Sequence, residues 1–526
     1  ANLFLGGLSL KELPRPSWPL TVDEARAIDL NAEYLGVPRE LLMENAGRAV
    51  AEAVARRIKV EGKNVVVLAG TGNKGGDGFV ASRHLAIKGA KVTVILLGTE
   101  DDIVTKEAKM NWRALKAMDL SVEIKRIRDS AELREVERFI VEADVVIDAL
   151  IGTGLRGELR EPFKTAVQLM NRSRGLKVAI DVPTGLNPDT GEVLGGAFRA
   201  DVTVTMHRAK KGMAGREDYT GEVEVADIGI PPEAELYAGP GDVSMVIKPR
   251  RPDTHKYDYG VVVVIGGSPL YAGAPALAAM AALKAGCGLA VVVAPRSAAP
   301  YIKSYSPDLI VLPLKSDWLS REALEGEGEL ERLFSRKCVV VLGPGMGLSD
   351  ESRRGFEYVL DKAAELGLRV VIDADGLKAL KGLEGRLKNL DSALTPHRGE
   401  FKALFGYEPP LSLSGAVEAA LREASRLRCT LVLKGHLTVV ADGLRVKINR
   451  EGNPGMAVGG VGDVLSGLIA GFMAQGARTF EACVAATFIN GRAGNLTASE
   501  KGYHFTASDV LDKVPAALRE YEYWLS

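Results

Sequence analysis

Short runs of β-branched and apolar residues alternate with helical patterns along the chain. In the first half these runs are apolar at nearly every position, which is typical of strands buried on both faces of a parallel sheet. They span residues 64–70, 92–98, 144–150, 177–183 and 201–206. Helical patterns such as residues 39–58 accompany them. This alternation predicts an α/β fold, a Rossmann-like three-layer sandwich with helices on both faces of the sheet.

The rhythm stops at residues 231–254, where prolines, glycines and charged residues replace the apolar runs, as at a domain junction. The alternation then resumes, with runs at residues 261–267, 289–295, 338–345, 369–376, 392–397 and 430–435. At 526 residues the chain is too long for one hydrophobic core, so two α/β domains are expected. We divide it into an N-terminal arm of unknown role at residues 1–20, a first domain at 21–235 and a second domain at 236–526.

Composition excludes several classes of partner. With 67 Lys and Arg against 68 Asp and Glu, the chain has no excess of positive charge for a nucleic acid or a membrane surface. No run approaches the roughly 18 apolar residues of a membrane span, and the first residues lack the basic leader of a signal peptide. The 4 cysteines match no zinc spacing, which predicts reduced core residues and a cytoplasmic protein.

Glycines and acidic residues gather where the predicted strands end, and ligands of open parallel sheets bind at those ends. We therefore expect one binding site in each domain. In the first, "AGTGNKGGDGF" at residues 69–79 follows a strand and opens a helix. Gly70, Gly72 and Gly75 satisfy the dinucleotide pattern G-x-G-x-x-G, but the acid that should support it is badly placed. A plain strand-to-helix turn remains an alternative.

Further strand ends of the first domain supply oxygen ligands. Asn73, Asp148 and Thr184 come from three such ends, and their oxygens could hold a monovalent or a hard divalent cation. Asp181 stands apart from this set and is a candidate acid or base. Taken singly, each acid could equally cap a helix or form a turn, but three polar strand ends together favour a site.

In the second domain, "GGVGDVLSG" at residues 459–467 leads into an apolar helical pattern. Gly459, Gly460 and Gly462 can curl successive N–H groups into an anion-binding nest, to which the positive end of the helix adds. Asp463 at this position suits a base that deprotonates a hydroxyl as a phosphoryl group is transferred to it. The alternative is a helix cap, worth about 1 kcal/mol.

The stretches "GTGNKGGDGF", "DALIGTGLRG" and "DVPTGLNPDTG", with "MENAG" upstream, resemble the N-terminal domain of the bifunctional NAD(P)H-hydrate repair enzymes. That resemblance implies an epimerase in which Asp181 is catalytic and Asn73, Asp148 and Thr184 bind a potassium ion. It implies substrate contacts at Gly72, Asn73, Lys74, Gly75, Gly76, Asp77, Gly152, Thr153, Gly154, Leu155, Arg156, Gly157, Glu158 and Asp181. Lys74 replaces the small or amide residue expected there, and it could contact a phosphate or point to solvent.

Stretches of the second domain resemble the NAD(P)H-hydrate dehydratase domain, a member of the ribokinase-like superfamily. They are "GGSPLYAGAP", "LGPGMG", "DADGLKAL", "LTPHRGEF", "LKGHLT" and "GGVGD". The resemblance implies a nucleotide site at Lys434, Gly435, His436, Leu437, Thr438 and Gly462. It implies a hydrate site at Ala274, Gly345, His397 and Asp463. Val458 and Val461 replace polar residues that the family often carries, so anion binding should rest on backbone N–H groups.

Together the resemblances predict a two-step repair enzyme, an isomerase fused to a lyase. The first domain would interconvert the R and S forms of hydrated NADH or NADPH, and the second would dehydrate the S form with ADP, or ATP, and Mg²⁺. Phosphoryl transfer would make the ring hydroxyl a good leaving group, so that elimination restores the reduced nicotinamide. A homo-oligomer is also implied. The alternative is a small-alcohol kinase, for a vitamin precursor, fused to a nucleotide-sensing domain.

Overall fold

The computed structural model describes residues 18–154 and 157–523. By their internal contacts these residues form two compact units, which meet in the sequence between Pro231 and Pro232. That point lies within the proline-rich stretch. Most of the predicted arm, residues 1–17, lies outside the described residues, whereas Leu20 pairs with Lys210 of the first unit.

The first unit is built on a seven-stranded sheet in which every strand runs parallel to its neighbours, in the order β3-β2-β1-β4-β5-β6-β7. The strands are β1 (Asn64–Ala69), β2 (Lys91–Leu97), β3 (Val122–Ile127), β4 (Val145–Ala149), β5 (Leu176–Ile180), β6 (Val202–Met206) and β7 (Glu222–Ala226). Every residue of the central strand β4 is buried, which explains its unbroken apolar run.

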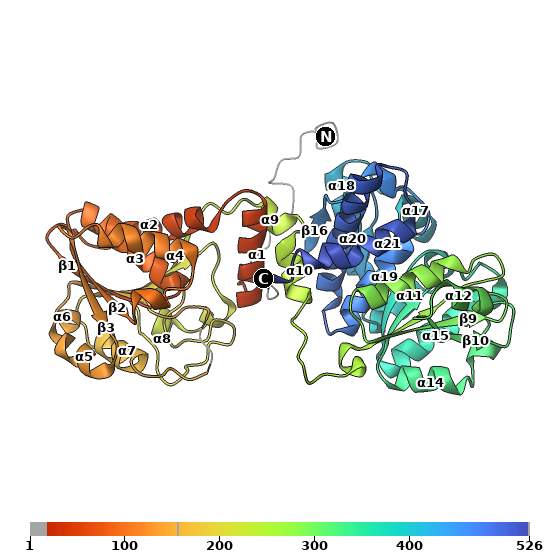
Figure 1. Ribbon diagram of the computed structural model, residues 1–526, viewed down its shortest axis with the longest axis horizontal. Helices are drawn as coiled ribbons and strands as arrows, with labels where there is room; N and C mark the ends of the chain where they lie inside the picture. The colour runs from red at the N-terminus through yellow and green to blue at the C-terminus, as the bar shows by residue number, and fades with distance from the viewer. Residues whose placement is uncertain (1–17, 155–156, 524–526) are drawn as a thin grey trace. The chain divides into compact units, whose positions relative to one another are not determined.

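Helices cover both faces of this sheet, as the alternation predicts. α2, α3 and α4 pack together on one face and α5, α6 and α7 on the other (Figure 1). Val66, Val146 and Met170 belong to the core on the side of the second group. The helices are α1 (Val22–Tyr34), α2 (Arg39–Arg57), α3 (Asn73–Ile87), α4 (Lys106–Lys116), α5 (Ser130–Glu135), α6 (Glu137–Val141), α7 (Phe163–Asn171) and α8 (Glu217–Thr220), with short 3₁₀ turns at Glu100–Asp102 and Lys211–Met213.

The second unit contains a nine-stranded sheet in the order β10-β9-β8-β11-β12-β13-β14-β15-β16. Its strands are parallel from β10 to β14, and β15 and β16 continue the sheet antiparallel. They are β8 (Val261–Ile265), β9 (Leu289–Pro295), β10 (Ile310–Leu314), β11 (Val339–Leu342), β12 (Arg369–Ile372), β13 (Ser392–Leu394), β14 (Thr430–Leu433), β15 (Thr438–Ala441) and β16 (Val446–Asn449).

Helices again lie on both faces of the second sheet. One face carries α10, α11, α19, α20 and α21, and the other carries α13 to α18. The helices are α9 (Glu233–Leu236), α10 (Pro240–Val246), α11 (Gly273–Lys284), α12 (Ala299–Tyr305), α13 (Arg321–Leu324), α14 (Gly328–Ser335), α15 (Asp350–Leu366), α16 (Asp375–Ala379), α17 (Arg398–Phe405), α18 (Leu413–Leu427), α19 (Val461–Ala474), α20 (Thr479–Lys501) and α21 (Ala507–Arg519). Short 3₁₀ turns occur at Lys256–Tyr259, Glu384–Asn389 and Pro454–Met456.

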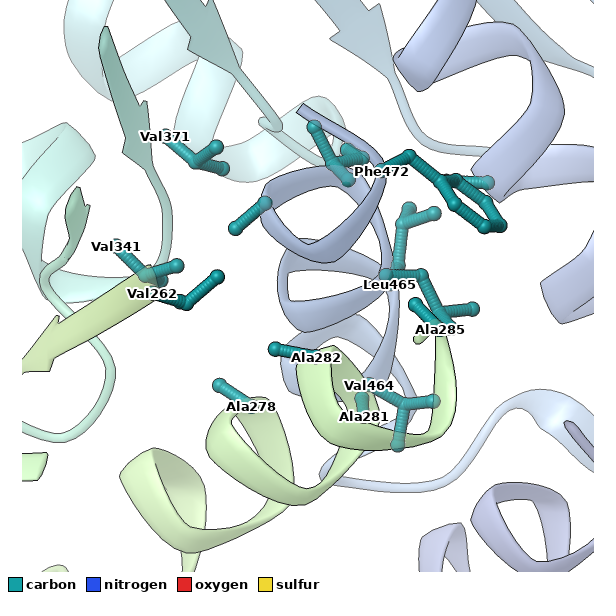
Figure 2. Close-up of a cluster of buried hydrophobic side chains, with 14 of the residues drawn as sticks. Val262, Ala278, Ala281, Ala282, Ala285, Val341, Val371, Val464, Leu465 and Phe472 are labelled. Atoms are coloured by element: carbon teal, nitrogen blue, oxygen red, sulfur yellow. The ribbon is translucent and has the colours of Figure 1, made fainter. Parts of the chain in front are cut away.

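Helix α19 is packed closely against α11 and the centre of the sheet. Figure 2 shows Val262 and Val341 of the sheet facing these two helices. A methyl group at Gly467 would lie 2.0 Å from the carbonyl oxygen of Ala278, so only glycine permits this approach. The packing fixes the position of the N-terminus of α19. No helix of the described residues is long and apolar enough to cross a membrane.

Every apolar run that the sequence marks as a strand is a strand in the structure, and the α/β fold class is confirmed. The strands that were not predicted are β3, β7, β10, β15 and β16, which lie toward the edges of the two sheets. β7 alternates acidic and apolar residues and leaves Val225 exposed. β10 contains Pro313, which an edge strand tolerates.

Candidate functional sites

The first candidate site is a cavity of about 740 Å³ in the first unit. Its wall is formed by the segments that follow the carboxyl ends of β1, β4, β5 and β6, together with residues of α1 and α2. Ligand sites of parallel α/β sheets lie at these ends. The charged residues of the wall are Arg26, Asp29, Arg39, Lys74, Asp77, Asp181 and Lys210.

The glycine loop between β1 and α3 lines the cavity and also lets α3 pack closely against the sheet. Gly72 is exposed, and a methyl group there would meet no atom within 4 Å. A methyl group on Gly75, by contrast, would lie 2.0 Å from the carbonyl oxygen of Gly70, and one on Gly78 would lie 2.5 Å from Ala149 Cβ. These contacts let α3 begin directly against the strand ends, so most glycines of the pattern are explained by packing.

The substrate residues predicted for this unit divide by their position. Those in the cavity wall are Gly72, Asn73, Lys74, Asp77, Gly152, Thr153, Gly154 and Asp181. Gly75, Gly76, Gly157 and Glu158 are not part of the described cavity wall, and their contacts with a substrate stay predictions. The physical reason is clear for Gly76, whose added methyl group would lie 2.6 Å from Met43 Sδ in the interior. Leu155 and Arg156 lie outside the described residues.

Asp181 is held in an unusual backbone conformation directly after β5. Its φ of 62° lies in the left-handed region, which a non-glycine residue adopts only where its surroundings enforce it. Lys210 Nζ donates a hydrogen bond to Asp181 Oδ1 at 2.6 Å, and Thr205 Oγ1 donates another at 3.2 Å. Burial acts to raise the pKa of Asp181, but the Lys210 ammonium outweighs it and holds that pKa below its usual value. Asp181 is therefore an ionised carboxylate at neutral pH.

Two further carboxyl groups of the cavity, Asp77 and Asp29, have raised pKa values. Burial, together with the charge of Asp181, raises the pKa of Asp77 well above its ordinary value. Burial also raises the pKa of Asp29 to about 6, against the opposing effect of Arg39. The cavity thus combines an ionised carboxylate with carboxyl groups that burial makes harder to ionise, an arrangement that can separate a proton acceptor from a proton donor.

Lys74 is buried, and its ammonium lies among oxygen atoms from separate loops. Its Nζ donates to Asp148 Oδ2 at 2.8 Å, to the carbonyl oxygen of Val182 at 2.8 Å and to Thr184 Oγ1 at 3.1 Å. The carbonyl oxygen of Ile151 is 3.4 Å away. Lys74 therefore does not point to solvent, and protein oxygens already accept all three N–H groups of an ammonium.

The three residues predicted to bind a cation are not all brought together. Thr184 Oγ1 donates to Asp148 Oδ1 at 2.6 Å, so these two meet. Asn73 takes part elsewhere, because its Oδ1 accepts a hydrogen bond from Thr105 Oγ1 at 2.6 Å at the surface. The oxygens of Asp148 and Thr184 surround a lysine ammonium, so the predicted ligand set does not fit a potassium ion as it stands.

The second candidate site surrounds the N-terminus of α19, near the carboxyl ends of β12, β13 and β14. α19 begins at Val461, and its N-cap residue Gly460 has a φ of 96°. A methyl group on Gly462 would lie 3.2 Å from Lys434 Nζ, so the helix N-terminus adjoins the end of β14. Asp463 is in the first turn, and no side chain caps the helix. The capping alternative for Asp463 is thus wrong.

A buried ionic cluster lies beside this helix terminus. Lys434 Nζ donates to Asp373 Oδ1 at 3.0 Å and lies 3.7 Å from Glu400 Oε2. Ser466 Oγ of α19 donates to Asp373 Oδ2. Lys434 was predicted, whereas Asp373, Glu400 and Ser466 were not assigned a role. Asp373 carried a usable signal, because it is an acidic residue that directly follows the strand β12.

Burial and the nearby Asp373 carboxylate raise the pKa of Asp463 to about 7, while Lys434 acts in the opposite direction. A carboxyl group with such a pKa can take up a proton near neutral pH and give it back. Backbone N–H groups of the helix N-terminus lie next to it and suit an anion. The arrangement is chemically suited to phosphoryl transfer onto a hydroxyl group.

The other predicted residues of this unit lie at strand ends and loops around the cluster. A methyl group on Gly345, where φ is 63°, would lie 3.5 Å from Ala274 Cβ, so these two predicted hydrate contacts are neighbours. His397 caps α17, since its Nδ1 accepts from the Gly399 N–H at 3.0 Å. Its backbone also forms an isolated parallel β-bridge with that of Lys434. The predicted nucleotide residues Gly435, His436, Leu437 and Thr438 form the turn between β14 and β15 and its edge.

The structure explains why Val461 replaces the polar residue that the family often carries. Its side chain is buried in the core that α19 shares with α11, so the position serves packing and not ligand binding. Within residues 18–154 and 157–523, no group of three or more His, Cys, Asp or Glu side chains is placed to hold a metal ion.

Family models match both units. Residues 262–516 match the model described as NAD(P)H-hydrate dehydratase, and residues 39–212 match the YjeF-related protein N-terminus. The chain is 46% identical over 507 residues to the bifunctional NAD(P)H-hydrate repair enzyme Nnr of Pyrobaculum aerophilum, covering 96% of this chain and 99% of that protein. It is 44% identical over 505 residues to the enzyme of the same name from Methanothermobacter thermautotrophicus, covering 94% of each.

Among solved structures, the chain is similar to an ADP/ATP-dependent NAD(P)H-hydrate dehydratase from Bacillus subtilis that was co-crystallised with ATP and Mg²⁺. The identity is 25% and the TM-score 0.45, and the match covers 55% of this chain and 99% of that one.

Proposed function

We infer the roles of the two sites from one premise: the chain belongs to the family of bifunctional NAD(P)H-hydrate repair enzymes. It is an NAD(P)H-hydrate epimerase and an NAD(P)H-hydrate dehydratase in one polypeptide. We assign the epimerase to residues 21–235 and the dehydratase to residues 236–526, with residues 1–20 as an arm of unknown role. The small-alcohol kinase alternative is therefore not retained.

For the dehydratase, we propose that Asp463 accepts the proton of the ring hydroxyl while the nucleotide transfers a phosphoryl group to that oxygen. The N-terminus of α19 and its glycines would hold the transferring group through backbone N–H donors. The phosphate ester then leaves as inorganic phosphate, driven by the lone pair of the ring nitrogen, and NADH or NADPH is restored. The observation that carries this proposal is Asp463, with a pKa of about 7, in the first turn of α19.

Lys434 is a positively charged neighbour of the proposed base Asp463 and acts to lower its pKa. Its ammonium lies between the carboxylates of Asp373 and Glu400, and Gly462 is its neighbour on the helix. The proposed nucleotide contacts are Lys434, Gly435, His436, Leu437, Thr438 and Gly462, and the proposed hydrate contacts are Ala274, Gly345, His397 and Asp463. ADP is our proposed phosphoryl donor, with ATP as the alternative. Mg²⁺ would arrive with the nucleotide, whose phosphates supply most of its ligands.

Asp463→Asn tests the dehydratase proposal. With ADP, Mg²⁺ and hydrated NADH, recovery of the absorbance of reduced nicotinamide should fall by about a hundredfold or more, as for loss of a general base. Asp509→Asn is a matched control, since Asp509 occupies the same first-turn position in α21. It should keep most of the wild-type rate. Near wild-type turnover of Asp463→Asn would remove Asp463 from the role.

For the epimerase, we propose that Asp181 moves a proton at the hydrated ring carbon. That carbon bears both nitrogen and oxygen, so it can lose and regain water, or open and close the ring. Lys210 keeps Asp181 ionised and fixes the orientation of its carboxylate through the 2.6 Å contact. Asp77, which lines the same cavity and has a raised pKa, is a candidate proton donor. The other proposed substrate contacts are Gly72, Asn73, Gly152, Thr153 and Gly154.

Epimer exchange without nucleotide tests this assignment in the full chain, because the dehydratase is then silent. Wild-type protein should interconvert the R and S hydrates, as followed by chromatography, and Asp181→Ala should abolish the exchange. Asp189→Ala, at a partly buried acid of the same segment that accepts from the Val22 N–H, provides the control. Unchanged exchange in Asp181→Ala would refute the role. A cytoplasmic setting and a homo-oligomer stay predictions.

A further inference from the structure

The Lys74 side chain is placed unlike an ordinary surface lysine. It leaves the first turn of α3, runs past Gly152 and ends among the oxygens of Asp148, Val182 and Thr184. Only 5% of the side chain is exposed, and none of the Asp148 side chain is. The residue therefore joins α3 to the loops that follow β4 and β5.

The same oxygens would otherwise serve a hard monovalent cation. Asp148 supplies a carboxylate, Thr184 a hydroxyl, and Val182 and Ile151 carbonyl groups, which are the oxygen types that such ions prefer. A second positive charge in this buried cage would face the ammonium at close range, with little water to screen the repulsion. The cage therefore has room for one cation, and Lys74 supplies it.

We propose that the Lys74 ammonium is a tethered cation that replaces a bound potassium ion, so that the first unit orders its cavity loops without any monovalent metal. The proposal rests on the epimerase function assigned above. Lys74 is a positioning residue: it holds the loops that carry Thr153 and Asp181 in the cavity wall, and it does not touch the reacting atoms. A covalently attached charge also stays in place at any salt concentration.

The hydrogen bonding around Asp148 supports this role. Its Oδ1 accepts from the Leu150 N–H at 3.1 Å and from Thr184 Oγ1, and its Oδ2 accepts from the Thr184 N–H at 2.7 Å and from Lys74. A carboxylate bonded in this way is fully enclosed by protein, and among residues 18–154 and 157–523 its ion-pair partner is Lys74. Removal of the ammonium would leave a buried charge without a partner, which is strongly unfavourable unless another cation enters.

Wild-type protein provides the first test. Its epimerisation rate should be the same within about twofold in potassium chloride and in choline chloride at equal ionic strength. Crystals of the full chain soaked in thallium(I), a stand-in for potassium, should show no anomalous peak between Asp148 and Thr184. A rate that requires potassium, or a thallium peak at that place, would overturn the proposal.

Lys74→Asn provides the second test, with Lys63→Asn as its matched control. Lys63 also forms an ion pair with an aspartate, Asp144, but at the surface. Lys74→Asn should bind thallium at Asp148 and lose about tenfold or more of its epimerisation rate in choline, with recovery in potassium. Lys63→Asn should behave as wild type in both salts. Equal rates of Lys74→Asn in the two salts would contradict the proposal.

The thallium measurement does not depend on catalysis. If no form of the chain epimerised the hydrate, the proposed function would fail while the thallium positions still decided the role of Lys74. If Lys74→Asn did not fold in any salt, the two wild-type measurements would carry the test alone.

Discussion

Replacing Asp463 by asparagine should abolish dehydration and at the same time stabilise the second unit above pH 7. Burial and the Asp373 charge raise the pKa of Asp463 from an ordinary 3.8 to about 7 in the folded protein. Folding therefore favours the protonated form. The contribution of this group to stability is fully present at low pH and is lost as the pH rises from about 4 to about 7. Asparagine carries no such pH dependence.

The size of the effect follows from the pKa shift. A shift of about three units corresponds to about 4 kcal/mol at roughly 1.4 kcal/mol per unit, which is an upper bound. The charges of Asp373 and Lys434 act on Asp463 in opposite directions, so part of this shift belongs to the cluster and not to Asp463 alone. We therefore expect Asp463→Asn to gain on the order of 2 kcal/mol at pH 8 and little at pH 4.

Hydrogen exchange of the central strands β8 and β11 in guanidinium measures this quantity for the second unit alone. Asp509→Asn is again the control, because Lys501 lowers the pKa of Asp509 to about 2. Its loss should destabilise the unit slightly at pH 8, the opposite sign. An Asp463→Asn protein that is less stable than wild type at pH 8 would show instead that Asp463 acts as a stabilising helix acid, and the predicted sign would be wrong.

Two other predictions concern residues of each site. Gly460→Ala should destabilise the second unit by about 1 to 3 kcal/mol, because its φ of 96° is left-handed and the added methyl group would lie 2.8 Å from Leu277 Cδ1. Gly459→Ala, whose methyl group meets nothing within 4 Å, is the control, and equal losses in denaturant unfolding would contradict the account. Lys210→Met should slow epimerisation by about tenfold or more and shift its acid limb to higher pH, since the pKa of Asp181 would rise. A pH profile that matches wild type would exclude that coupling.

The strands at the centre of each sheet were predictable because burial on both faces leaves an unbroken apolar signature. Edge strands lack that signature: β7 reads "EVEVA", since one of its faces meets solvent. The apolar runs also continued past the true strand ends. The run at residues 369–376 stops as a strand at Ile372, and Asp373 begins the loop that carries the ionic cluster.

The chemistry of each site was predictable from motifs, but the pairing of charges was not. Asp181 could be chosen from its place at a strand end, whereas its partner Lys210 follows a different strand and belongs to no recognised motif. Lys74 is the clearest case. Its sequence neighbours suggested that Lys74 contacts a phosphate or points to solvent. The structure instead places its ammonium in the interior, in contact with Asp148 and Thr184, which are distant in the sequence.

The two sites together should repair a mixture of hydrate epimers. The most direct measurement supplies equal amounts of the R and S hydrates with ADP and Mg²⁺, and follows NADH and inorganic phosphate to completion. Wild type should convert both epimers with one phosphate released per NADH. Asp181→Ala should convert the S hydrate rapidly and leave the R hydrate unconverted. Asp463→Asn should convert neither. A stable phosphate ester as the product, or rapid full conversion by Asp181→Ala, would contradict the account.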